Sequence, residues 1–157
     1  MVVTRIRPNH NNCLLPEVEA IVAAGGIVIG KGPNRSNIAI VRRRRYPGEV
    51  ALPKGKLRFG EQVAEAARRE VREETGSEVT IREFAGTTRY FVDGMPKIVF
   101  YYVMDEDEGA SRGDPTDTKE IESVEWTSPE RSLTVLTHRE DRDLVAAVFG
   151  VKKGARL

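Results

Sequence analysis

Residues 55–77 of this chain read GKLRFGEQVAEAARREVREETGS, and this stretch decides the fold. No glycine or proline interrupts the run from Gln62 to Thr75, and most of its residues are good helix formers. Gly76 follows as a natural C-terminal stop. The stretch therefore predicts a glycine-bearing loop that leads into one helix over 62–75.

Glutamates crowd one face of the predicted helix. At about 100° per residue, Glu70, Glu73 and Glu74 point the same way. Like charges three and four residues apart oppose helix formation by roughly 0.2–0.5 kcal/mol per pair, and a bound divalent cation would reverse that repulsion. The alternative is a solvated charged face, which is supported by opposite-charge pairs of Arg69 with Glu65 and with Glu73.

The spacing of the stretch distinguishes these alternatives. Eight positions stand at fixed intervals, namely Gly55, Glu61, Arg69, Glu70, Val71, Glu73, Glu74 and Gly76. This pattern closely resembles the Nudix box, the defining motif of the Nudix hydrolases, which cleave nucleoside diphosphates linked to some other group X. The chain departs from the pattern at Ser77, where the family usually has an aliphatic residue that packs helix on sheet. We interpret Val79 as the residue that fills this packing role.

The resemblance implies a metal site. Diphosphate hydrolysis needs metal ions that neutralise phosphate oxygens and lower the pKa of a water, and Mg²⁺, with Mn²⁺ as an alternative, prefers oxygen ligands. By resemblance, the catalytic and metal-binding glutamates are Glu70, Glu73 and Glu74, and the backbone carbonyl of Gly55 is an additional ligand. The resemblance also implies that Arg69 orients a glutamate of the box through a salt bridge.

Charged residues around the box have two interpretations each. Glu61 either favours the positive end of the helix dipole as a cap or supports the metal site. Lys54 and Lys56 flank the first glycine of the box, and they either contact phosphate or remain solvated. Residues 42–45 are all arginines, and side chains alternate on a strand, so two of them, with Arg43 as the candidate, would point towards one phosphate chain. The alternative is a solvated edge strand whose charge discourages pairing between sheets.

A further carboxylate is expected outside the box, because family members often recruit one from a later loop as a metal ligand or as the base that activates water. The best candidate is Glu120, which directly precedes a predicted strand in TDTKEIESVEW (116–126). Asp105, Asp117 and Glu122 are its competitors. A plain surface carboxylate is the alternative to a catalytic role.

Aromatic residues and histidines carry weaker signals. The aromatic residues are interpreted as core or hairpin-face residues, with one of them as a candidate platform for a nucleobase; they are Tyr90, Phe91, Tyr101, Tyr102 and Trp126. Neither His10 nor His138 has the spacing of a metal ligand, so both are interpreted as surface histidines.

The rest of the chain predicts strands before and after the helix. Runs of β-forming residues, turn dipeptides and helix-start signals define these elements. Strands are expected over 19–30, 37–45 and 121–126, and a hairpin is expected from strands over 79–92 and 97–104. One helix is expected to start at Ser128 and another to cover 139–149. Inside the first strand, Gly25-Gly26 predicts a bulge or a close backbone approach. This order gives an α/β fold with a mixed sheet covered by helices, which matches the α/β/α sandwich of the Nudix fold.

Composition bounds the class of protein. At 157 residues, the chain fits one domain over 17–157 after a flexible lead-in over 1–16. A net charge of +1 gives no reason to expect nucleic acid or a membrane as a partner. Cys13 is the only cysteine, which excludes an internal disulfide. Because no apolar run approaches the ~18 residues of a membrane span and the start lacks the apolar core of a signal peptide, a cytoplasmic enzyme is expected.

The box indicates the reaction class more firmly than the substrate, because group X is recognised outside it. The segments ALPKGKLRFGE (51–61) and KIVFYYVMDED (97–107) resemble the branch that cleaves dinucleoside polyphosphates and diphosphoinositol polyphosphates, which we favour. Oxidised nucleoside triphosphates rank second and ADP-ribose third. A non-catalytic Nudix-like nucleotide-binding module is disfavoured, because such modules usually lose box glutamates that this chain keeps. The sequence leaves the oligomeric state open.

Overall fold

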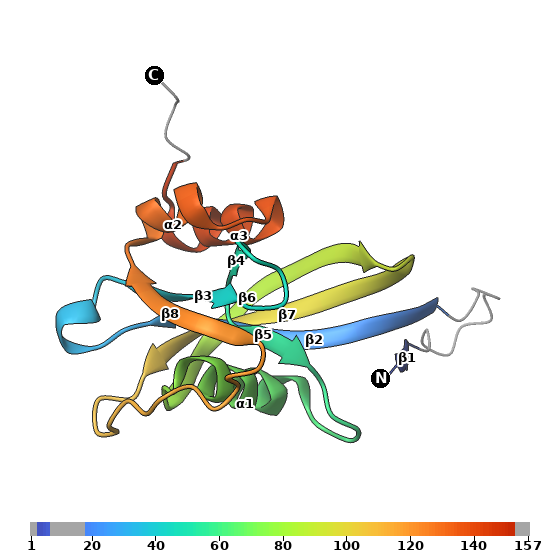
Figure 1. Ribbon diagram of the computed structural model, residues 1–157, viewed down its shortest axis with the longest axis horizontal. Coiled ribbons are helices and arrows are strands. Elements are labelled where there is room, and N and C mark those ends of the chain that lie inside the picture. The colour runs from blue at the N-terminus through green and yellow to red at the C-terminus, as the bar shows by residue number, and fades with distance from the viewer. Residues whose placement is uncertain (1–2, 7–17, 153–157) are drawn as a thin grey trace.

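The computed structural model describes residues 3–6 and 18–152 (Figure 1). The strands are β1 (Val3–Ile6), β2 (Val18–Ile29), β3 (Ile38–Arg43), β4 (Val50–Ala51), β5 (Lys54–Lys56), β6 (Val79–Val92), β7 (Met95–Glu106) and β8 (Ile121–Thr127). The helices are η1, a 3₁₀ turn (Gly32–Asn34), α1 (Val63–Thr75), α2 (Pro129–Val135) and α3 (Arg139–Phe149). Every helix and strand expected from the sequence is present, and β1, β4, β5 and η1 are additional.

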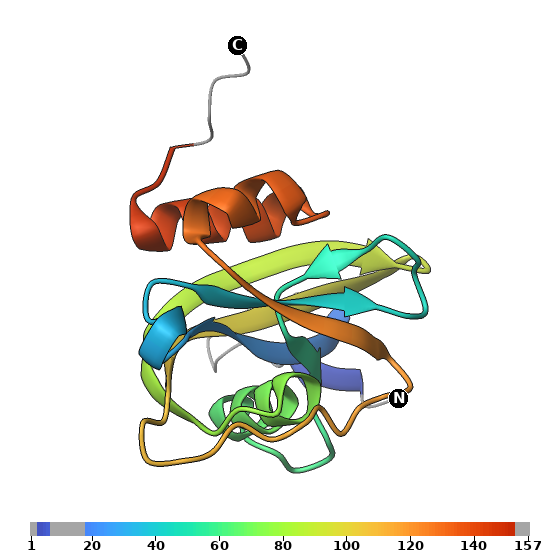
Figure 2. The ribbon, with the colours of Figure 1, turned by 60° about the vertical axis from the view of Figure 1, so that its left-hand side comes forward.

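A mixed eight-stranded sheet forms the middle of the molecule. Strands β2 and β7 run parallel at its centre, and the other strand pairs are antiparallel. Helix α1 covers one face, and α2 and α3 cover the opposite face (Figure 1, Figure 2). These three layers confirm the expected α/β/α sandwich.

Helix α1 is anchored by a short apolar stripe. Ala66, Ala67 and Val71 are buried and pack on the sheet with Met104 of β7. Val79 belongs to the same cluster, so it fills the packing role proposed for it. The helix ends as expected, because the residue that follows it, Gly76, has a left-handed φ of 76°. The apolar stripe therefore fixes the glutamate-bearing side of the helix towards the cleft described below.

The glycine pair in β2 permits a close backbone approach. A Cβ on Gly25 would collide with the carbonyl of Pro53 and with Lys54. The amide of Gly26 donates a hydrogen bond of 3.1 Å to that same carbonyl. The close approach holds β5, which contains Gly55, against the middle of the sheet.

The β6–β7 hairpin has a tighter turn than expected. Asp93 and Gly94 both have positive φ, of 49° and 77°, which is the signature of a two-residue type I′ turn. Met95 and Pro96 were expected in the loop, but they pair with Val92 and Phe91 as the first residues of β7. The expected start of this strand at Lys97 was therefore wrong by two residues, because Asp93 adopts the left-handed conformation that the shorter turn requires.

The C-terminal helices and the lead-in complete the fold. The Ser128 hydroxyl accepts a hydrogen bond of 3.2 Å from the Arg131 amide and caps α2, and Gly150 closes α3 with a φ of 63°. Within the expected lead-in, Val3–Ile6 form β1 and pair with β2. His10 and Cys13 lie outside the described residues. Across residues 3–6 and 18–152, none of the helices has the length and apolarity needed to cross a bilayer.

Candidate active site

A cleft of about 1080 Å³ is lined by β5, α1, the tip of the β6–β7 hairpin and the loop between β7 and β8. Its cationic lining residues are Arg43, Arg45, Lys54, Lys56, Arg58, Arg69 and Lys97. Its acidic lining residues are Glu49, Glu70, Glu73, Asp93, Asp117 and Glu120. The cleft thus combines cations suited to phosphate with carboxylates suited to a metal ion.

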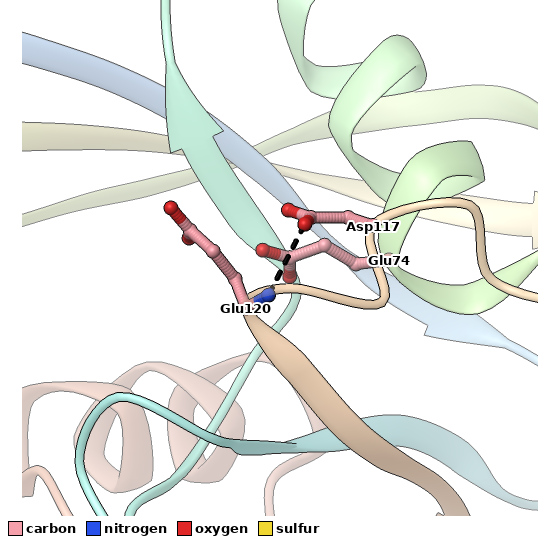
Figure 3. Close-up of side chains that lie close together, drawn as sticks. All are labelled: Glu74, Asp117 and Glu120. Carbon is pink, nitrogen blue, oxygen red and sulfur yellow. Dashed lines mark hydrogen bonds between the residues drawn. The ribbon is translucent and has the colours of Figure 1, made fainter.

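Three carboxylates meet beside this cleft (Figure 3). Glu74 comes from α1, whereas Asp117 and Glu120 come from residues 107–120, which we call the β7–β8 loop. One carboxylate oxygen from each lies within 4.8 Å of the others. The Glu120 amide donates a hydrogen bond of 3.2 Å to Asp117 Oδ1, which fixes the two loop residues relative to each other.

The structure sorts the four candidate carboxylates outside the box. Glu120 and its competitor Asp117 both reach the cluster. Asp105 instead forms a forked ion pair with Arg82. Glu122 is exposed on β8 and does not line the cleft. The expected loop carboxylate is therefore represented by two residues at the site.

Glu74 is the buried member of the cluster, with a relative exposure of 2%. The pKa of Glu74 is raised to about 8, mainly by burial and also by the nearby charge of Glu70, although the charge and the amide of Lys54 oppose the rise. The Lys54 amide also donates a hydrogen bond of 3.0 Å to Glu74 Oε2. A divalent cation would compensate a charge that this environment otherwise disfavours.

Arg69 connects the acidic residues of the box. Its Nε and one terminal nitrogen donate to Glu61 at 2.6 and 2.8 Å, and the other terminal nitrogen donates to Glu70 at 2.7 Å and to Glu73 at 3.1 Å. The Arg69 hydrogen bond is the main cause that lowers the pKa of Glu61. Because Gln62, not Glu61, is the N-cap of α1, these contacts favour support of the site over capping for Glu61.

Gly55 lies directly against Glu70. A Cβ at Gly55 would fall on the Glu70 carboxylate, so this backbone approach requires glycine. Burial raises the pKa of Glu70, and the ion pair with Arg69 opposes the rise. The structure thus brings Gly55 and Glu70 together, as expected for two members of one site.

Glu73 has a different environment from Glu74. Its carboxylate is shared between Arg58 and Arg69, each at 3.1 Å. Its backbone carbonyl accepts hydrogen bonds from the amides of Thr116 and Asp117, at 2.9 and 3.0 Å. The carboxylate of Glu73 is thus held by two arginines, and its backbone carbonyl holds the β7–β8 loop.

The arginine run divides between the cleft and the surface. Arg43 and Arg45 line the cleft, whereas Arg42 pairs with Glu125 at 3.6 Å and Arg44 donates to backbone carbonyls of the β7–β8 region. Arg43 donates to Glu120 Oε2 at 3.1 Å. Its Nε is buried and has no hydrogen-bond partner among the described residues. Two arginines of the run therefore face the cleft, as one of the two interpretations requires.

The two lysines beside Gly55 differ in burial. Lys54 is 6% exposed and lines the cleft, and its charge lies close enough to stabilise ionised Glu74. Lys56 also lines the cleft but is exposed, and its carbonyl accepts a hydrogen bond from Arg69. Both lysines therefore line the cleft, one of them buried and the other exposed.

Sequence reasoning missed several lining residues. Lys97 lies 5.5 Å from the centre of the Tyr90 ring, and burial, together with Lys54 and other cations, lowers the pKa of Lys97 to about 8. The Tyr90 ring in turn stacks on the His138 ring, with 6.1 Å between the ring centres. The Nε2 atom of His138 is hydrogen-bonded to Glu49 Oε1 at 2.6 Å. Tyr90 was named from the sequence as a candidate base platform, and the pairing of Lys97 opposite Tyr90 across the hairpin is the signal that could have found Lys97.

The aromatic residues fall into two groups. Tyr90 and Phe91 line the cleft together with Tyr46, and Phe91 is 75% exposed. Tyr101 is fully buried and Tyr102 packs beside α1, so these two are core residues, as interpreted from the sequence. Burial is also the main cause that raises the pKa of Tyr90, to about 12, so this phenol is neutral at physiological pH.

The donor set of the site fits a hard divalent ion. Oxygen donors are available from the carboxylates of Glu74, Asp117 and Glu120 and from Glu70 and Glu73, which line the cleft. Neither cysteine nor histidine belongs to the cluster, so the donor chemistry suits Mg²⁺ or Mn²⁺ better than Zn²⁺.

Comparison with curated proteins gives distant sequence relatives. Over 113 residues, 72% of this chain and 34% of the other, the chain is 29% identical to the 8-oxo-(d)GTP phosphatase of Mycolicibacterium smegmatis. Over 92 residues, 54% of this chain and 65% of the other, it is 28% identical to the nucleoside triphosphatase NudI of Escherichia coli. The chain thus spans about a third of the length of the first relative and about two thirds of the length of the second.

Solved structures share the fold. A C. elegans Ap4A hydrolase in a binary complex superposes with a TM-score of 0.69 at 23% identity, covering 84% of this chain and 100% of the other. The MutT protein from Methanosarcina mazei Go1 superposes with a TM-score of 0.65 at 23% identity, covering 87% and 96%. The profile of the NUDIX domain matches residues 20–148, which include the box, the β7–β8 loop, α2 and α3 as far as Val148. The chain therefore belongs to the NUDIX domain family, as the box predicted.

Proposed function

We propose that the protein is a magnesium-dependent hydrolase that cleaves a diphosphate linkage in a nucleoside diphosphate derivative, with manganese as an alternative ion. The observation that carries this proposal is the meeting of Glu74, Asp117 and Glu120 beside a cation-lined cleft. A site of this composition suits an ion and a phosphate chain at the same time. The retained box glutamates argue against a module that only binds nucleotides.

The proposed ion-holding residues are the box glutamates, the Gly55 carbonyl and the two loop carboxylates. When bound there, the ion supplies positive charge that neutralises phosphate oxygens and acidifies the attacking water. Arg69 keeps Glu70 and Glu73 oriented through its shared hydrogen bonds. Without these bonds the like charges of Glu70 and Glu73, three residues apart on α1, would repel each other.

The loop carboxylates are the candidates for the general base. The Glu120 side chain is 49% exposed, and one of its oxygens accepts a hydrogen bond from Arg43. The other oxygen is available to take a proton from water that attacks phosphorus. Asp117 is the second candidate, since it belongs to the same cluster. Lys54, Lys56 and Lys97 would hold the negative charge of the substrate and of the leaving phosphate.

For the substrate class we favour dinucleoside polyphosphates. The cleft volume of about 1080 Å³ lies just above the usual range for small-molecule sites, so the cleft has room for a nucleotide with an extended phosphate chain. Cations that include Arg43 and Lys97 line the cleft, and so do the aromatic residues Tyr90 and Phe91 of β6. The buried Nε of Arg43 and Oε2 of Glu49 lack partners within the described chain, and a phosphate and a nucleoside hydroxyl or amine would satisfy them.

Oxidised nucleoside triphosphates are the second candidate. They are favoured by the identity of 29% to a protein named as an 8-oxo-(d)GTP phosphatase. The same cations would bind a triphosphate, and a single base would occupy the aromatic side of the cleft. ADP-ribose ranks third, because no observation on the cleft favours it.

One experiment separates these candidates. The purified protein is incubated with diadenosine tetraphosphate, 8-oxo-dGTP, dGTP or ADP-ribose across a magnesium titration, and the products are resolved by ion-exchange chromatography. We expect turnover that requires magnesium and is highest for the dinucleoside polyphosphate. Full turnover in excess chelator would refute the mechanism, and a clear preference for 8-oxo-dGTP over dGTP and the dinucleotide would reverse the substrate ranking.

A further inference from the structure

A buried acidic residue outside the cleft ends strand β7. Glu106 is 5% exposed, and both of its carboxylate oxygens accept hydrogen bonds of 2.7 Å from the Arg112 guanidinium. The Ser77 hydroxyl donates to the same carboxylate at 3.0 Å, and the Lys31 amide donates at 3.1 Å. We call these four residues the Glu106 clamp.

The clamp compensates the burial of its carboxylate. Burial alone would raise the pKa of Glu106, but the Arg112 fork and the Ser77 hydroxyl outweigh that effect and lower it. Ser77 is the position at which this chain departs from the box pattern. Its hydroxyl serves the clamp, so the departure has a structural purpose that an aliphatic side chain would not supply.

Arg112 and Lys31 extend the clamp onto the β7–β8 loop. The Arg112 guanidinium lies 4.1 Å from the centre of the Trp126 ring on β8. The Lys31 ammonium donates to the backbone carbonyls of Asp107 and Ala110. The first half of the loop is therefore fastened to β8 and to the turn after β2.

The middle of the loop is fastened to the end of α1. The Gly113 amide donates to the Gly76 carbonyl at 2.8 Å, and a Cβ on Gly76 would collide with the backbone of Gly113. Three residues further on, the amides of Thr116 and Asp117 donate to the Glu73 carbonyl. The chain that joins the clamp to Asp117 is thus short and pinned at both ends.

We propose that the Glu106 clamp is a positioning device for the metal site. Through Arg112 and Lys31 it fixes the β7–β8 loop, and thereby sets where Asp117 and Glu120 stand relative to Glu74. Its residues touch neither the substrate nor the ion. This inference rests on the proposed function, because the placement of the two loop carboxylates matters for an ion that all three residues hold.

The test compares two clamp variants with a matched control. Arg112→Lys keeps a cation beside Glu106 but loses the two-pronged fork. Lys31→Met removes the ammonium that donates to the loop and keeps the backbone amide. The control is Arg82→Ala, which breaks a forked ion pair with Asp105, the residue next to Glu106 on the same strand. Arg112→Ala is avoided because it would leave a buried carboxylate unpaired and endanger folding.

Three measurements on metal-free protein report on the clamp. Titration calorimetry gives the affinity for magnesium, and hydrogen exchange gives the protection of the Thr116 and Asp117 amides. The fluorescence of Trp126, the only tryptophan of the chain, reports on the stacked Arg112. In both clamp variants we expect faster exchange at these two amides and magnesium affinity lower by about 10–100-fold, as for loss of other outer-shell partners of metal sites. In Arg112→Lys the tryptophan emission should also shift.

The outcomes separate the clamp from the proposed function. Faster exchange with unchanged magnesium affinity, or equal losses in Arg82→Ala, would overturn the positioning role and leave a merely structural clamp. Unchanged exchange in both variants would overturn it as well. If the unaltered protein binds no magnesium, the proposed metal site fails and the inference fails with it, and the exchange data then show only whether the clamp holds the loop.

Discussion

The Lys54 amide donates a hydrogen bond to the buried carboxylate of Glu74. This bond joins β5, at the residue before Gly55, to the last turn of α1, so the two ends of the box meet at one side chain. Glu74 therefore has two tasks, to accept this bond and to contribute to the carboxylate cluster. Replacement by glutamine separates the tasks, because the amide oxygen still accepts the bond while the charge is lost.

Glu74→Gln should abolish most turnover without unfolding the protein. Loss of a ligand charge at the centre of the cluster should cost more than the roughly 10–100-fold typical of outer-shell partners. The metal-free variant should be at least as stable as the unaltered protein above the unfolded pKa of 4.5, because burial and Glu70 disfavour ionised Glu74 in the folded state and glutamine has no charge to lose. Turnover and thermal unfolding in chelator are measured, with exposed Glu65→Gln on the same helix as the control. Glu73→Gln should lose turnover similarly, and near-normal rates in both variants would refute the ligand assignment.

Glu120→Gln should lower turnover by about 10²–10⁴-fold, the range for a general base, while substrate affinity changes little. The reason is that a base acts mainly in the transition state. Single-turnover rates and substrate affinity are compared with those of Asp117→Asn and of the exposed control Glu122→Gln. If Asp117→Asn shows the loss and Glu120→Gln does not, the base is Asp117. Normal rates in both would mean that the box carboxylates suffice.

Gly55→Ala should damage both stability and the metal site. The added Cβ would fall on the Glu70 carboxylate, and such overpacking costs about 1–3 kcal/mol. Urea unfolding and magnesium affinity are the measurements. The control is Gly109→Ala, because a Cβ at Gly109 meets nothing within 4 Å. Equal behaviour of the two variants would show that Gly55 has no steric role.

Lys97→Met should stabilise the protein at neutral pH and weaken substrate binding. Burial and neighbouring cations lower the pKa of Lys97 to about 8 in the folded chain, against 10.5 in the unfolded chain. Between these values the unfolded state binds more protons, so the stability of the unaltered protein rises with pH, and below pH 8 the destabilisation is fully present. The advantage of the variant should therefore be largest below pH 8 and fade towards pH 10.5.

Urea unfolding at a series of pH values checks this dependence, with exposed Lys152→Met as the control. In the same variant the KM for an anionic substrate should rise by roughly tenfold, since one charge-assisted hydrogen bond is lost. A constant stability difference across the pH range would contradict the assigned cause.

Local signals predicted most of the fold. Helix α1 follows from uninterrupted helix formers and a terminal glycine, and α3 ends at Gly150 for the same reason. The hairpin was predicted from its turn residues, but its turn length was not, because that depends on whether Asp93 adopts a left-handed conformation. A short strand such as β5 carries no sequence signal of its own, since its pairing depends on the close approach at Gly25.

The candidate site was predicted only in part. The fixed spacing of the box predicted Gly55, Arg69 and the glutamates as one group, and Gly55, Arg69, Glu70 and Glu73 do lie together at the cleft. Sequence alone ranked Glu120 above Asp117 but did not reveal that both reach Glu74, since that depends on backbone bonds from the loop to Glu73. The stacking of Tyr90 on His138 joins β6 to the N-cap of α3, which is far away in sequence, so no local sequence pattern predicts it.

The position of Asp117 and Glu120 in the β7–β8 loop also determines when the site can form during synthesis of the chain. A nascent chain that ends at Val92 already contains the entire box, yet neither loop carboxylate has been synthesised. The central pairing of β2 with β7 is parallel and non-local, which makes it slow to form. The box is therefore complete before the carboxylate cluster can form. We expect a ribosome-bound chain to bind an ion only once β8 has emerged. Ion binding by arrested chains of increasing length would show when this happens.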